Sequence, residues 1–583
     1  MRVVLVDLSA KYIHSGLAVK YLNNACINSF PNTIVVEETI NRPIEKLVEI
    51  IYQKNPQIVG FSCYIWNIET VLNLTKTLKK LIPDLTIILG GPEVSYTPED
   101  IISKNNEIDY IVCGEGEIAL PKLLAAIKDK DNVNIKGVYT KNHKTDELTD
   151  YHMDLNDIPY PYEGLTKKDL ANKIVYYECS RGCPYRCAYC LSGLAGKVRF
   201  LNIDRVKKEL LDLAINKEVK QIKFVDRTFN HNREYAYEIF SFLKELDCQT
   251  NFHFEVRADI FDDKTLELLK DAPKGRFQFE IGVQSTNKKT LEAINRPHNW
   301  DKLTKNVSIV KSFDNIHQHL DLIAALPYED IESFKKSFCD VFSLKPDMLQ
   351  LGFLKLLKGS SIWIDRTKYS YKAADYAPYE VLCSNWLDFD KLLELKGVEH
   401  VLEIFYNSNH FKHTLNYAID FHNSYDFFKS LSTYFKSNEL DMRNHSLHNL
   451  FEILFEFFSS YFTDKLDILR ELLKLDYISH FMHRRLPDYM NHQEIGNYKQ
   501  TTALLLKKEE VRSVLSSELS DKNEREILKQ THFELFRLNI ELLINTGEVD
   551  FTPSLLLFDY TLRDKDFFSS KAKFYTITDY QID

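Results

Sequence analysis

Several features common in other protein classes are missing from this 583-residue sequence. It contains no uninterrupted apolar run of about 18 residues, which is what a membrane-spanning helix needs. The amino terminus has no apolar core followed by a small-residue cleavage site, so a signal peptide is not predicted. We therefore expect a soluble, cytoplasmic chain that crosses no membrane.

Glycine and cysteine are also scarce, and the chain has no net positive charge. The 18 glycines make up about 3% of the chain, less than half of the usual ~7%, so clustered glycines mark places where the backbone needs them. The net charge of −10 excludes the global basic field of a protein that wraps nucleic acid. Ten cysteines are too few for a disulfide scaffold. Four of them fall within 179–190, which predicts a metal or catalytic cluster.

The first part of the chain alternates buried strand-like runs with helical segments, which indicates a parallel sheet covered on both faces. The strand-like runs lie at 2–8, 33–40, 58–64, 86–91 and 110–117. We predict a doubly wound, Rossmann-like domain over residues 1–140. Ligands of such sheets bind beyond the carboxyl ends of the strands, here the loops at 9–16, 62–67, 90–97 and 114–117.

A second α/β series follows a linker at 141–170 that includes a polar hairpin around Lys141 to Glu147. Its six predicted strands lie at 173–179, 221–227, 251–259, 276–285, 317–326 and 347–357. Six strand–helix repeats predict a (β/α)6 partial barrel over 171–365, because a full eight-fold barrel takes about 250 residues. From 366 to 583, long amphipathic stretches rich in Phe, Leu and Tyr predict a helical domain.

The sharpest motif is ECSRGCPYRCAYC at 178–190, directly after the first predicted barrel strand. Cys183, Cys187 and Cys190 have the spacing C-x3-C-x2-C, so three thiolates of one loop can surround a single metal centre. Structural zinc is the alternative, with Cys179 as the fourth ligand. Zinc sites usually use two separated knuckles, however, and no second cysteine pair follows. The motif therefore favours an iron–sulfur centre.

With the aromatic Tyr189 before its last cysteine, this loop resembles the signature of radical S-adenosylmethionine (SAM) enzymes. The resemblance implies a 4Fe–4S cluster held by Cys183, Cys187 and Cys190, with one iron open to the amino and carboxylate groups of SAM. It also implies that an electron from the cluster cleaves SAM to a 5′-deoxyadenosyl radical, which the protein directs at its substrate. These three cysteines are the predicted metal ligands and catalytic residues.

Other segments match the same family in order and supply predicted SAM contacts. Asp226, in FVDRTFN, stands where the family meets the SAM amino group. Glu255 and Arg257, in FEVRAD, are candidates for the SAM ribose or carboxylate, or alternatively for an ion pair inside the barrel. Glu280 and Gln284, in EIGVQS, resemble the fourth-strand motif and are expected to point toward the barrel opening.

Two further segments bear on the same resemblance. DLIAALP at 321–327 is similar to the family's DLIxGLP, with Ala325 where glycine is usual. INRPHN at 294–299 resembles a loop of coproporphyrinogen-oxidase-like members that is expected to face substrate.

The first domain resembles the cobalamin-binding domain that precedes the barrel in one branch of this superfamily. The motif Asp-x-His-x-x-Gly of cobalamin mutases is absent, because Asp7 and His14 are seven residues apart, so His14 is expected near the corrin rather than on cobalt. The candidate cobalamin contacts are Tyr12, His14, Ser62, Gly90, Gly91, Glu93, Gly114 and Gly116.

These resemblances imply a cobalamin-dependent radical SAM enzyme, with methyl transfer to an unactivated carbon as the first hypothesis. The alternatives are a radical rearrangement, cyclisation or ring contraction, or a catalytically dead cobalamin- or metal-binding regulatory protein. Methylthiolation is a further alternative, because those enzymes carry three more cysteines in their first domain and this chain has Cys26, Cys63 and Cys113.

The expected partners are an electron donor such as flavodoxin or ferredoxin and a small-molecule or peptide substrate. RNA stays open as a substrate class, because short basic runs lie at 483–485 and 506–508, although helix-surface charge also explains them. The sequence names neither the substrate nor the role of the helical domain.

Overall fold

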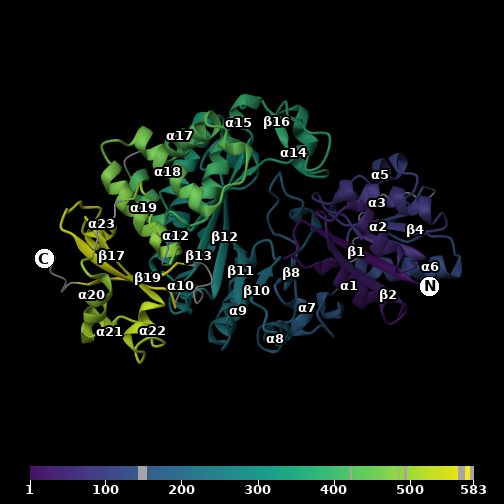
Figure 1. Cartoon of the computed structure of the whole chain (residues 1–583). Helices are drawn as coiled ribbons and strands as arrows, with labels where there is room; N and C mark the ends of the chain where they lie inside the picture. Colours follow the sequence, from purple (N-terminus) through teal and green to yellow (C-terminus); the bar gives the residue numbers. More distant parts are fainter. Residues whose placement is uncertain (142–153, 421–422, 483–484, 491–494, 562–570, 578–583) are drawn as a thin grey trace. The chain divides into compact units, whose positions relative to one another are not determined.

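The structure is a computed structural model that describes residues 1–141, 154–420, 423–482, 485–490, 495–561 and 571–577 (Figure 1). The chain divides into two units, Met1–Phe334 with Gly352–Leu392, and Lys335–Leu351 with Leu393–Asp583. Most of the hairpin predicted around Lys141 to Glu147, and most of the basic run at 483–485, lie outside the described residues. Within the described ranges, no helix has the length and apolar character needed to cross a membrane.

The amino-terminal domain is the predicted doubly wound fold. Its sheet has the order β2-β1-β3-β4-β5-β6, and all neighbours pair in parallel except β5 and β6. The strands are β1 Val3–Ser9, β2 Thr33–Thr39, β3 Ile58–Ser62, β4 Thr86–Gly90, β5 Tyr110–Val112 and β6 Val138–Tyr139. Its main helices are α1 Leu17–Cys26, α2 Ile44–Tyr52, α3 Ile68–Leu81 and α6 Gly116–Asp129, with the short α4 Pro92–Ser95 and α5 Pro98–Lys104 after β4.

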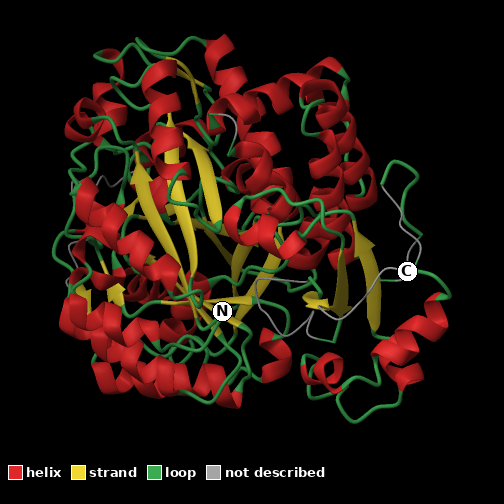
Figure 2. Ribbon diagram, turned by 90° about the vertical axis from the view of Figure 1, so that its left-hand side faces the viewer, coloured by secondary structure: helices red, strands yellow, loops and turns green. Residues whose placement is uncertain are grey.

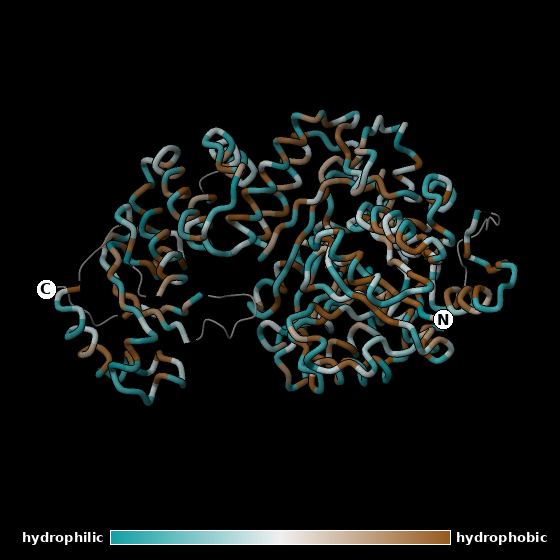
Figure 3. Tube along the Cα trace, turned by 45° about the vertical axis from the view of Figure 1, so that its right-hand side comes forward, coloured by the Kyte–Doolittle hydropathy of each residue, from teal (hydrophilic) through white to brown (hydrophobic). Residues whose placement is uncertain are grey.

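Two separate hydrophobic cores cover the two faces of this sheet. Leu47 of α2 and Leu74 of α3 belong to one core, and Val19 of α1 and Leu123 of α6 belong to the other. The hydrophobic colouring of Figure 3 accordingly concentrates along the central strands near the N-terminus. Since both faces are covered, the loops at the carboxyl ends of the strands are where this domain can take a ligand.

The second sheet has the order β14-β13-β12-β11-β10-β7, with β14 and β7 at its two edges, so it is a six-stranded open barrel as predicted. Its strands are β7 Ile174–Tyr177, β10 Gln221–Phe224, β11 Asn251–Val256, β12 Phe277–Gln284, β13 His317–Ala324 and β14 Met348–Phe353. The helices between them are α8 Ile203–Leu211, α9 Arg233–Glu245, α10 Asp263–Lys270, α11 Lys288–Ala293, α12 Trp300–Ser312 and α13 Ile331–Phe342. Figure 2 shows helices on the outside of these strands.

The strands of the barrel are apolar on the outer face and polar on the inner face. On β12, Phe277 and Phe279 are fully buried and pack against Phe240 of α9. The alternate residues Gln278 and Glu280 are only partly buried. Most barrels of this type fill their interior with branched apolar side chains. This interior is polar and open to water instead.

A tight contact joins the amino-terminal domain to the barrel within the first unit. The guanidinium of Arg181 forms ion pairs with Glu117 (2.8 Å) and Glu115 (3.3 Å) of the first domain and with Glu178 (2.8 Å) of its own loop. Arg199 also pairs with Glu115. Arg181 lies on β8 (Ser180–Arg181) and Arg199 on β9 (Arg199–Phe200), which pair with each other. The contact therefore reaches the base of the cysteine loop.

The second unit is mostly helical, as expected for the carboxyl-terminal part, and it also contains a sheet. The helices include α16 Lys412–Ile419, α17 Ser424–Ser437, α18 Leu447–Tyr461 and α19 Leu466–His480. Strands β17 Thr531–Phe536, β18 Ser554–Asp559 and β19 Lys573–Ile577 form an antiparallel sheet that the helical prediction did not include. The α19 side chain Lys474 is fully buried between Glu471 and Glu534.

Replacing Arg181 by Leu should destabilise the first unit by about 3 kcal/mol, because it leaves partly buried carboxylates without their cation. All four tryptophans lie in the first unit, so urea unfolding followed by tryptophan fluorescence reports on this unit. Arg42→Leu is the matched control, since the exposed Arg42–Glu38 pair is worth about 0.5 kcal/mol. Equal shifts in the two variants would show that the contact does not stabilise the unit.

Candidate functional site

The three thiols of the C-x3-C-x2-C motif share one loop, between β8 and β9, and each has a hydrogen-bond partner. Cys183 Sγ lies 3.7 Å from Thr228 Oγ1. Cys187 Sγ accepts from Arg296 Nη1 at 3.5 Å, and Cys190 Sγ accepts from the backbone N–H of Ser192 at 3.4 Å. Accepted hydrogen bonds stabilise the thiolate forms of Cys187 and Cys190, whereas burial raises the pKa of the Cys183 thiol. Cys183 feels the charges of both Cys187 and Cys190, which places the three close together.

Cys179, the possible fourth ligand, makes its hydrogen bonds to a carboxylate, unlike the other three cysteines of the segment. Its thiol donates to Asp226 Oδ1 at 3.1 Å, and its backbone N–H donates to Asp226 Oδ2 at 3.2 Å. Burial, together with the Asp226 carboxylate, raises the pKa of Cys179 well above its usual value. Cys179 therefore keeps its proton, which separates it from the other three cysteines.

The described residues contain no group of three His, Cys, Asp or Glu side chains placed to hold a single metal ion. Structural zinc needs its ligands around one ion, and the protonated Cys179 is a poor fourth ligand. In a cubane cluster, each thiolate binds a different iron, so the thiols need not converge on one point. The donor set thus fits a 4Fe–4S cluster better than zinc.

The INRPHN loop lies against the cysteine loop. The Ala188 N–H donates to Ile294 O at 2.8 Å, and Arg296 reaches both Cys187 Sγ and Gly282 O. Burial and the thiols of Cys187 and Cys190 raise the pKa of Tyr189, although Arg296 opposes the shift. The expectation that this loop faces substrate is not supported by these contacts, which make it a support for the cluster loop.

Asp226 lies beneath the cysteine loop rather than in the open site. It is 1% exposed and also accepts a hydrogen bond from the hydroxyl of Ser180. Burial raises its pKa to about 6, although hydrogen bonds from Ser180 and Cys179 oppose the shift. This placement favours a structural role for Asp226 over the predicted contact with the SAM amino group.

The two predicted third-strand residues have different surroundings. Arg257 is buried in an ion pair with Asp259 (2.7 Å) and lies over the ring of Tyr185. Arg257 therefore fits the alternative prediction, an ion pair inside the barrel, rather than a contact with SAM. Glu255 lies on the open side of the barrel, 3.4 Å from Arg227, and burial raises its pKa. Of the two, Glu255 is the one that a ligand can reach.

Glu280 is the centre of a charged layer inside the barrel. Its Oε2 lies 2.8 Å from Lys223 Nζ and 3.0 Å from His253 Nε2. Burial opposes ionisation, but His253 and Lys223 hold the pKa of Glu280 well below its usual range. The neighbouring strand β13 adds His319, 3.1 Å from Asp321. The side chains of Lys223 and Glu280 remain 26% and 21% exposed, so water reaches this layer.

Gln284 and Ala325 both adopt left-handed backbone conformations at the ends of barrel strands, with φ of 71° and 68°. Non-glycine residues rarely adopt such values. The Oε1 atom of Gln284 is buried and has no hydrogen-bond partner among the described residues. The Ala325 carbonyl accepts from Tyr371 Oη at 2.9 Å. Alanine thus adopts, at the usual glycine position, a conformation that glycine adopts more easily.

The predicted cobalamin contacts Tyr12 and His14 lie where the first domain meets the barrel. His14 Nδ1 is 2.8 Å from Tyr176 Oη, and burial lowers the pKa of His14. Tyr12 is 68% exposed and Trp66, from the next loop, is 47% exposed. The rings of Tyr64 and Trp66 stack at 4.4 Å. Exposed aromatic groups at this edge fit the large, flat corrin ring.

Several of the other predicted cobalamin contacts are taken up by the protein itself. Ser62 is buried and donates to Asp7 Oδ1 at 2.7 Å. Glu93 is buried, pairs with Lys358 at 3.3 Å and accepts from a tyrosine hydroxyl. A Cβ on Gly91 would lie 2.6 Å from a backbone oxygen, and one on Gly116 would lie 2.8 Å from a leucine side chain. These two glycines serve close packing inside the chain.

Gly90 and Gly114, unlike Gly91 and Gly116, are not needed for close packing inside the chain. A Cβ on Gly90 would meet nothing closer than 3.5 Å, and Gly114 is exposed with φ of 82°. Of the predicted glycines, these two stay candidates for close approach of a ligand to the backbone.

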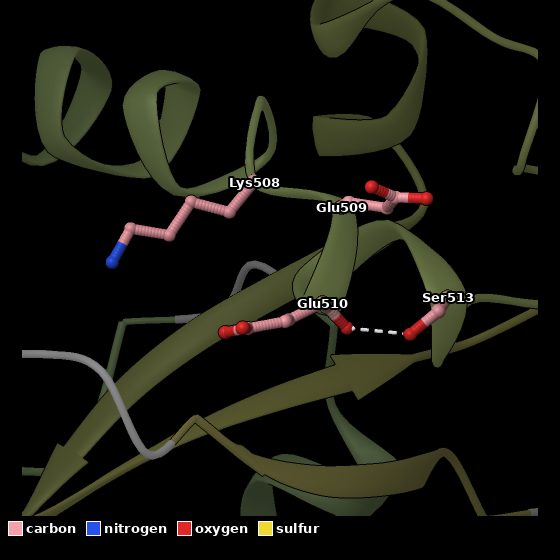
Figure 4. A pocket seen from close by; sticks show the side chains of 4 residues that line it. All are labelled: Lys508, Glu509, Glu510 and Ser513. Carbon is pink, nitrogen blue, oxygen red and sulfur yellow. Dashed lines mark hydrogen bonds between the residues drawn. The ribbon is translucent and has the colours of Figure 1, made fainter.

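A surface hollow elsewhere, of about 360 Å³, lacks comparable chemistry. It is lined by Lys508, Glu509, Glu510 and Ser513 of the second unit (Figure 4). The Ser513 hydroxyl donates to the backbone carbonyl of Glu510, and the charged side chains lie apart from one another. The cysteine loop and the barrel opening remain the candidate site.

Sequence reasoning missed Arg296, Lys223 and Arg227 as site residues. The signal for Arg296 was the INRPHN motif itself, read only as a loop. Lys223 could have been found from the strand alternation of QIKF, which places it on the same face as polar residues of its neighbours.

Family models match three successive parts of the chain. A model described as "B12 binding domain" matches residues 3–124, and one described as "Radical SAM superfamily" matches residues 177–339. A third, described as "Protein of unknown function (DUF4080)", matches residues 367–558. The first match spans β1 to β5 and the second spans β10 to β13, so each covers most of one parallel sheet.

Curated relatives match about half of the chain. An uncharacterized methyltransferase of Pyrococcus horikoshii is 26% identical over 54% of this chain and 71% of its own length. The cobalamin-dependent radical SAM methyltransferase TokK of Streptomyces tokunonensis is 27% identical over 50% of this chain and 45% of its own length. The match thus spans less than half of TokK.

A solved structure shares the fold over more of the chain. The cobalamin-dependent SAM radical enzyme OxsB, with aqua-cobalamin bound, superposes with a TM-score of 0.57 at 14% identity, covering 82% of this chain and 81% of OxsB. The predicted fold class is confirmed by this likeness and by the two family models. The chain belongs to the radical SAM proteins that carry an amino-terminal cobalamin-binding domain.

Proposed function

We propose that the protein is a cobalamin-dependent radical SAM enzyme that transfers a methyl group to an unactivated carbon. One observation carries the proposal. The three-cysteine loop starts on β8, the same strand that holds the glutamate loop of the cobalamin-binding domain through Arg181. The loop that fits a 4Fe–4S cluster and the edge that fits a corrin are therefore fixed to one another. Both relatives described above are named methyltransferases.

When bound, the cluster, SAM and cobalamin supply a radical that takes a hydrogen atom from carbon and a methyl group that replaces it. Cys183, Cys187 and Cys190 would hold the cluster. Arg296 places a cation beside Cys187, where an anionic group such as a carboxylate can bind. Glu255 presents an acceptor at the barrel opening.

The charged layer around Glu280 favours a polar substrate. An apolar ligand in the barrel would strip water from Lys223, Glu280 and Asp321 without replacing its hydrogen bonds, which is costly for ionised groups. A small polar metabolite or a peptide offers such bonds. An RNA substrate gains no support here, because the charged layer contains three acids (Glu255, Glu280 and Asp321) but only one lysine and one arginine.

Methylthiolation is disfavoured by the three cysteines of the first domain. Those enzymes need a second cluster, yet Cys26 lies in one core of the sheet while Cys63 and Cys113 lie in the other. Burial raises the pKa of Cys26 and of Cys113 to about 12. Three buried thiols on opposite faces of a sheet cannot ligate one cluster.

We place the protein in the cytoplasm. The reducing conditions there suit an iron–sulfur cluster that oxygen would destroy.

Substituting Ala for Cys183, Cys187 or Cys190 should abolish the cluster, because each variant leaves two thiolates for a cluster that needs three. Cys179→Ala is the matched control and should retain it, since the Cys179 thiol is engaged by Asp226. Iron and sulfide content and the electron paramagnetic resonance spectrum after anaerobic reconstitution measure both outcomes. Loss of iron in Cys179→Ala would contradict the ligand assignment.

Product counting distinguishes methyl transfer from rearrangement. With hydroxocobalamin, a strong reductant and substrate, methyl transfer should yield 5′-deoxyadenosine and S-adenosylhomocysteine in equal amounts, because one SAM supplies the radical and another supplies the methyl group. Chromatography with mass detection measures both. 5′-Deoxyadenosine without S-adenosylhomocysteine would support a rearrangement, cyclisation or ring contraction instead.

Arg296→Gln should lower the reduction potential of the reconstituted cluster by several tens of millivolts. The guanidinium donates to Cys187 and so stabilises the more negative, reduced form, and hydrogen bonds to cluster sulfur tune the potential. Spectroscopic redox titration measures the shift. Arg233→Gln, on the exposed start of α9, is the control and should leave the potential in place; an unchanged potential in Arg296→Gln would refute the role.

A further inference from the structure

One arginine at the barrel opening leaves most of its hydrogen-bond donors unused. Arg227 follows β10, and its side chain is 53% exposed. Among the residues that the structure describes, its guanidinium makes one hydrogen bond, from Nη1 to Glu255 Oε1 at 3.4 Å. A guanidinium carries five N–H donors in a fixed fork. Arg227 can therefore donate to a further acceptor that comes from outside the chain.

The other cations of the site have their donors engaged. Arg257 donates to both oxygens of one carboxylate and to a backbone carbonyl. Arg296 donates to a cysteine sulfur and to a backbone carbonyl. Lys223, on β10 itself, lies 2.8 Å from Glu280. Of these four cations, Arg227 is thus the one that is best placed to meet an anionic ligand.

Arg227 lies between the cysteine loop and the candidate corrin edge. The next residue, Thr228, lies 3.7 Å from Cys183 Sγ. On the other side, burial raises the pKa of Tyr64 and the charge of Arg227 opposes the shift, so Arg227 is close to the stacked rings of Tyr64 and Trp66. A substrate that loses a hydrogen atom to the radical and gains a methyl group from cobalamin must lie between these two places.

We propose that Arg227 binds a carboxylate of the substrate, in place of Glu255, and so selects substrates that carry this group; the inference rests on the proposed function. A carboxylate matches the guanidinium fork with two parallel hydrogen bonds, which fix orientation as well as position. A doubly charged phosphate would meet stronger repulsion from Glu255, which stays close by.

The existing partner of Arg227 is easily exchanged. A single 3.4 Å contact to a half-exposed arginine contributes little to stability, so a second carboxylate can replace Glu255 at small cost. Burial raises the pKa of Glu255, so its carboxyl takes up a proton more readily when another anion arrives. A substrate held by the fork has a fixed direction and presents one C–H bond to the radical.

The test labels arginines with phenylglyoxal in the anaerobically reconstituted protein and follows each labelled residue by peptide mass spectrometry. The probe is N-acetylglycine, a small carboxylate, and its uncharged methyl ester is the control compound. Arg227 should react, because it is exposed and loosely paired, and the probe should slow its labelling about fivefold. The ester should have no effect. Arg233, exposed at the start of α9, should react equally fast with and without the probe.

The variant Glu255→Gln makes the test more specific. It removes the carboxylate that competes for the guanidinium, so the concentration of N-acetylglycine that halves the labelling rate of Arg227 should fall about tenfold. Glu267→Gln, on α10, is the matched control, because the Glu267 side chain is 76% exposed and pairs with Lys270 instead. This control should leave that concentration unchanged. Equal concentrations in the two variants would contradict the exchange of carboxylates.

Other results would also overturn the proposal. If Arg227 is not labelled, or if the ester slows its labelling as much as N-acetylglycine does, no carboxylate site is open there. Stronger protection by inorganic phosphate would assign the site to another class of anion. Full protection by SAM alone, with no added effect of N-acetylglycine, would assign Arg227 to the cofactor.

Failure of the proposed function has a different signature, namely no SAM cleavage by the unchanged protein under dithionite. The labelling reads carboxylate binding at Arg227 without depending on that activity.

Discussion

The carboxylate of Asp226 fixes the point from which the cysteine loop starts. Three donors on two consecutive residues, Cys179 and Ser180, converge on it at the end of the first barrel strand. An unpaired carboxylate in such a position would cost several kcal/mol, so these donors and the carboxylate require one another. The same arrangement keeps the Cys179 thiol protonated. One buried group thereby both orients the loop and restricts the ligand set to three of its four cysteines.

The loop is fixed a second time by the contact between domains. Arg181 pairs with Glu178 beside its own loop and with Glu115 and Glu117 of the 114–117 loop, so a loop that was predicted to bind a ligand connects the two domains instead. Glu93 of the first domain also forms an ion pair across this contact, with Lys358, which follows the barrel strand β14. The exposed aromatic residues and the glycines that have open space remain the candidates for contact with a corrin. Ion pairs thus hold the candidate corrin edge against the barrel that carries the cysteine loop.

Much of this could be predicted from the sequence because it depends on periodicity and spacing. Uninterrupted Val/Ile runs predicted the first parallel sheet, six strand–helix repeats predicted the second, and three cysteines on one loop indicated the candidate cluster site. The roles of Asp226, Ser62 and Glu93 could not be predicted, because alternation shows which face a side chain occupies but not which neighbour fills the space there. The sheet formed by β17, β18 and β19 was not predicted, for a related reason. Its pairing joins residues far apart in a stretch whose Leu- and Phe-rich composition also suits helices.

Charge shows most clearly how composition and structure differ. The net charge of −10 correctly argues against a nucleic-acid-wrapping protein, yet it hides where unpaired charge lies. Arg181, Arg199 and Arg257 all form ion pairs with carboxylates of the chain itself, so they contribute little to the electrostatic field outside the protein. Arg186 and Lys197 keep their charge available to solvent, because both are exposed and neither forms an ion pair with a residue that the structure describes. Because a screened field reaches only about 10 Å at ordinary salt, the charge that a molecule meets at one surface depends on the unpaired side chains there rather than on the net charge of the chain.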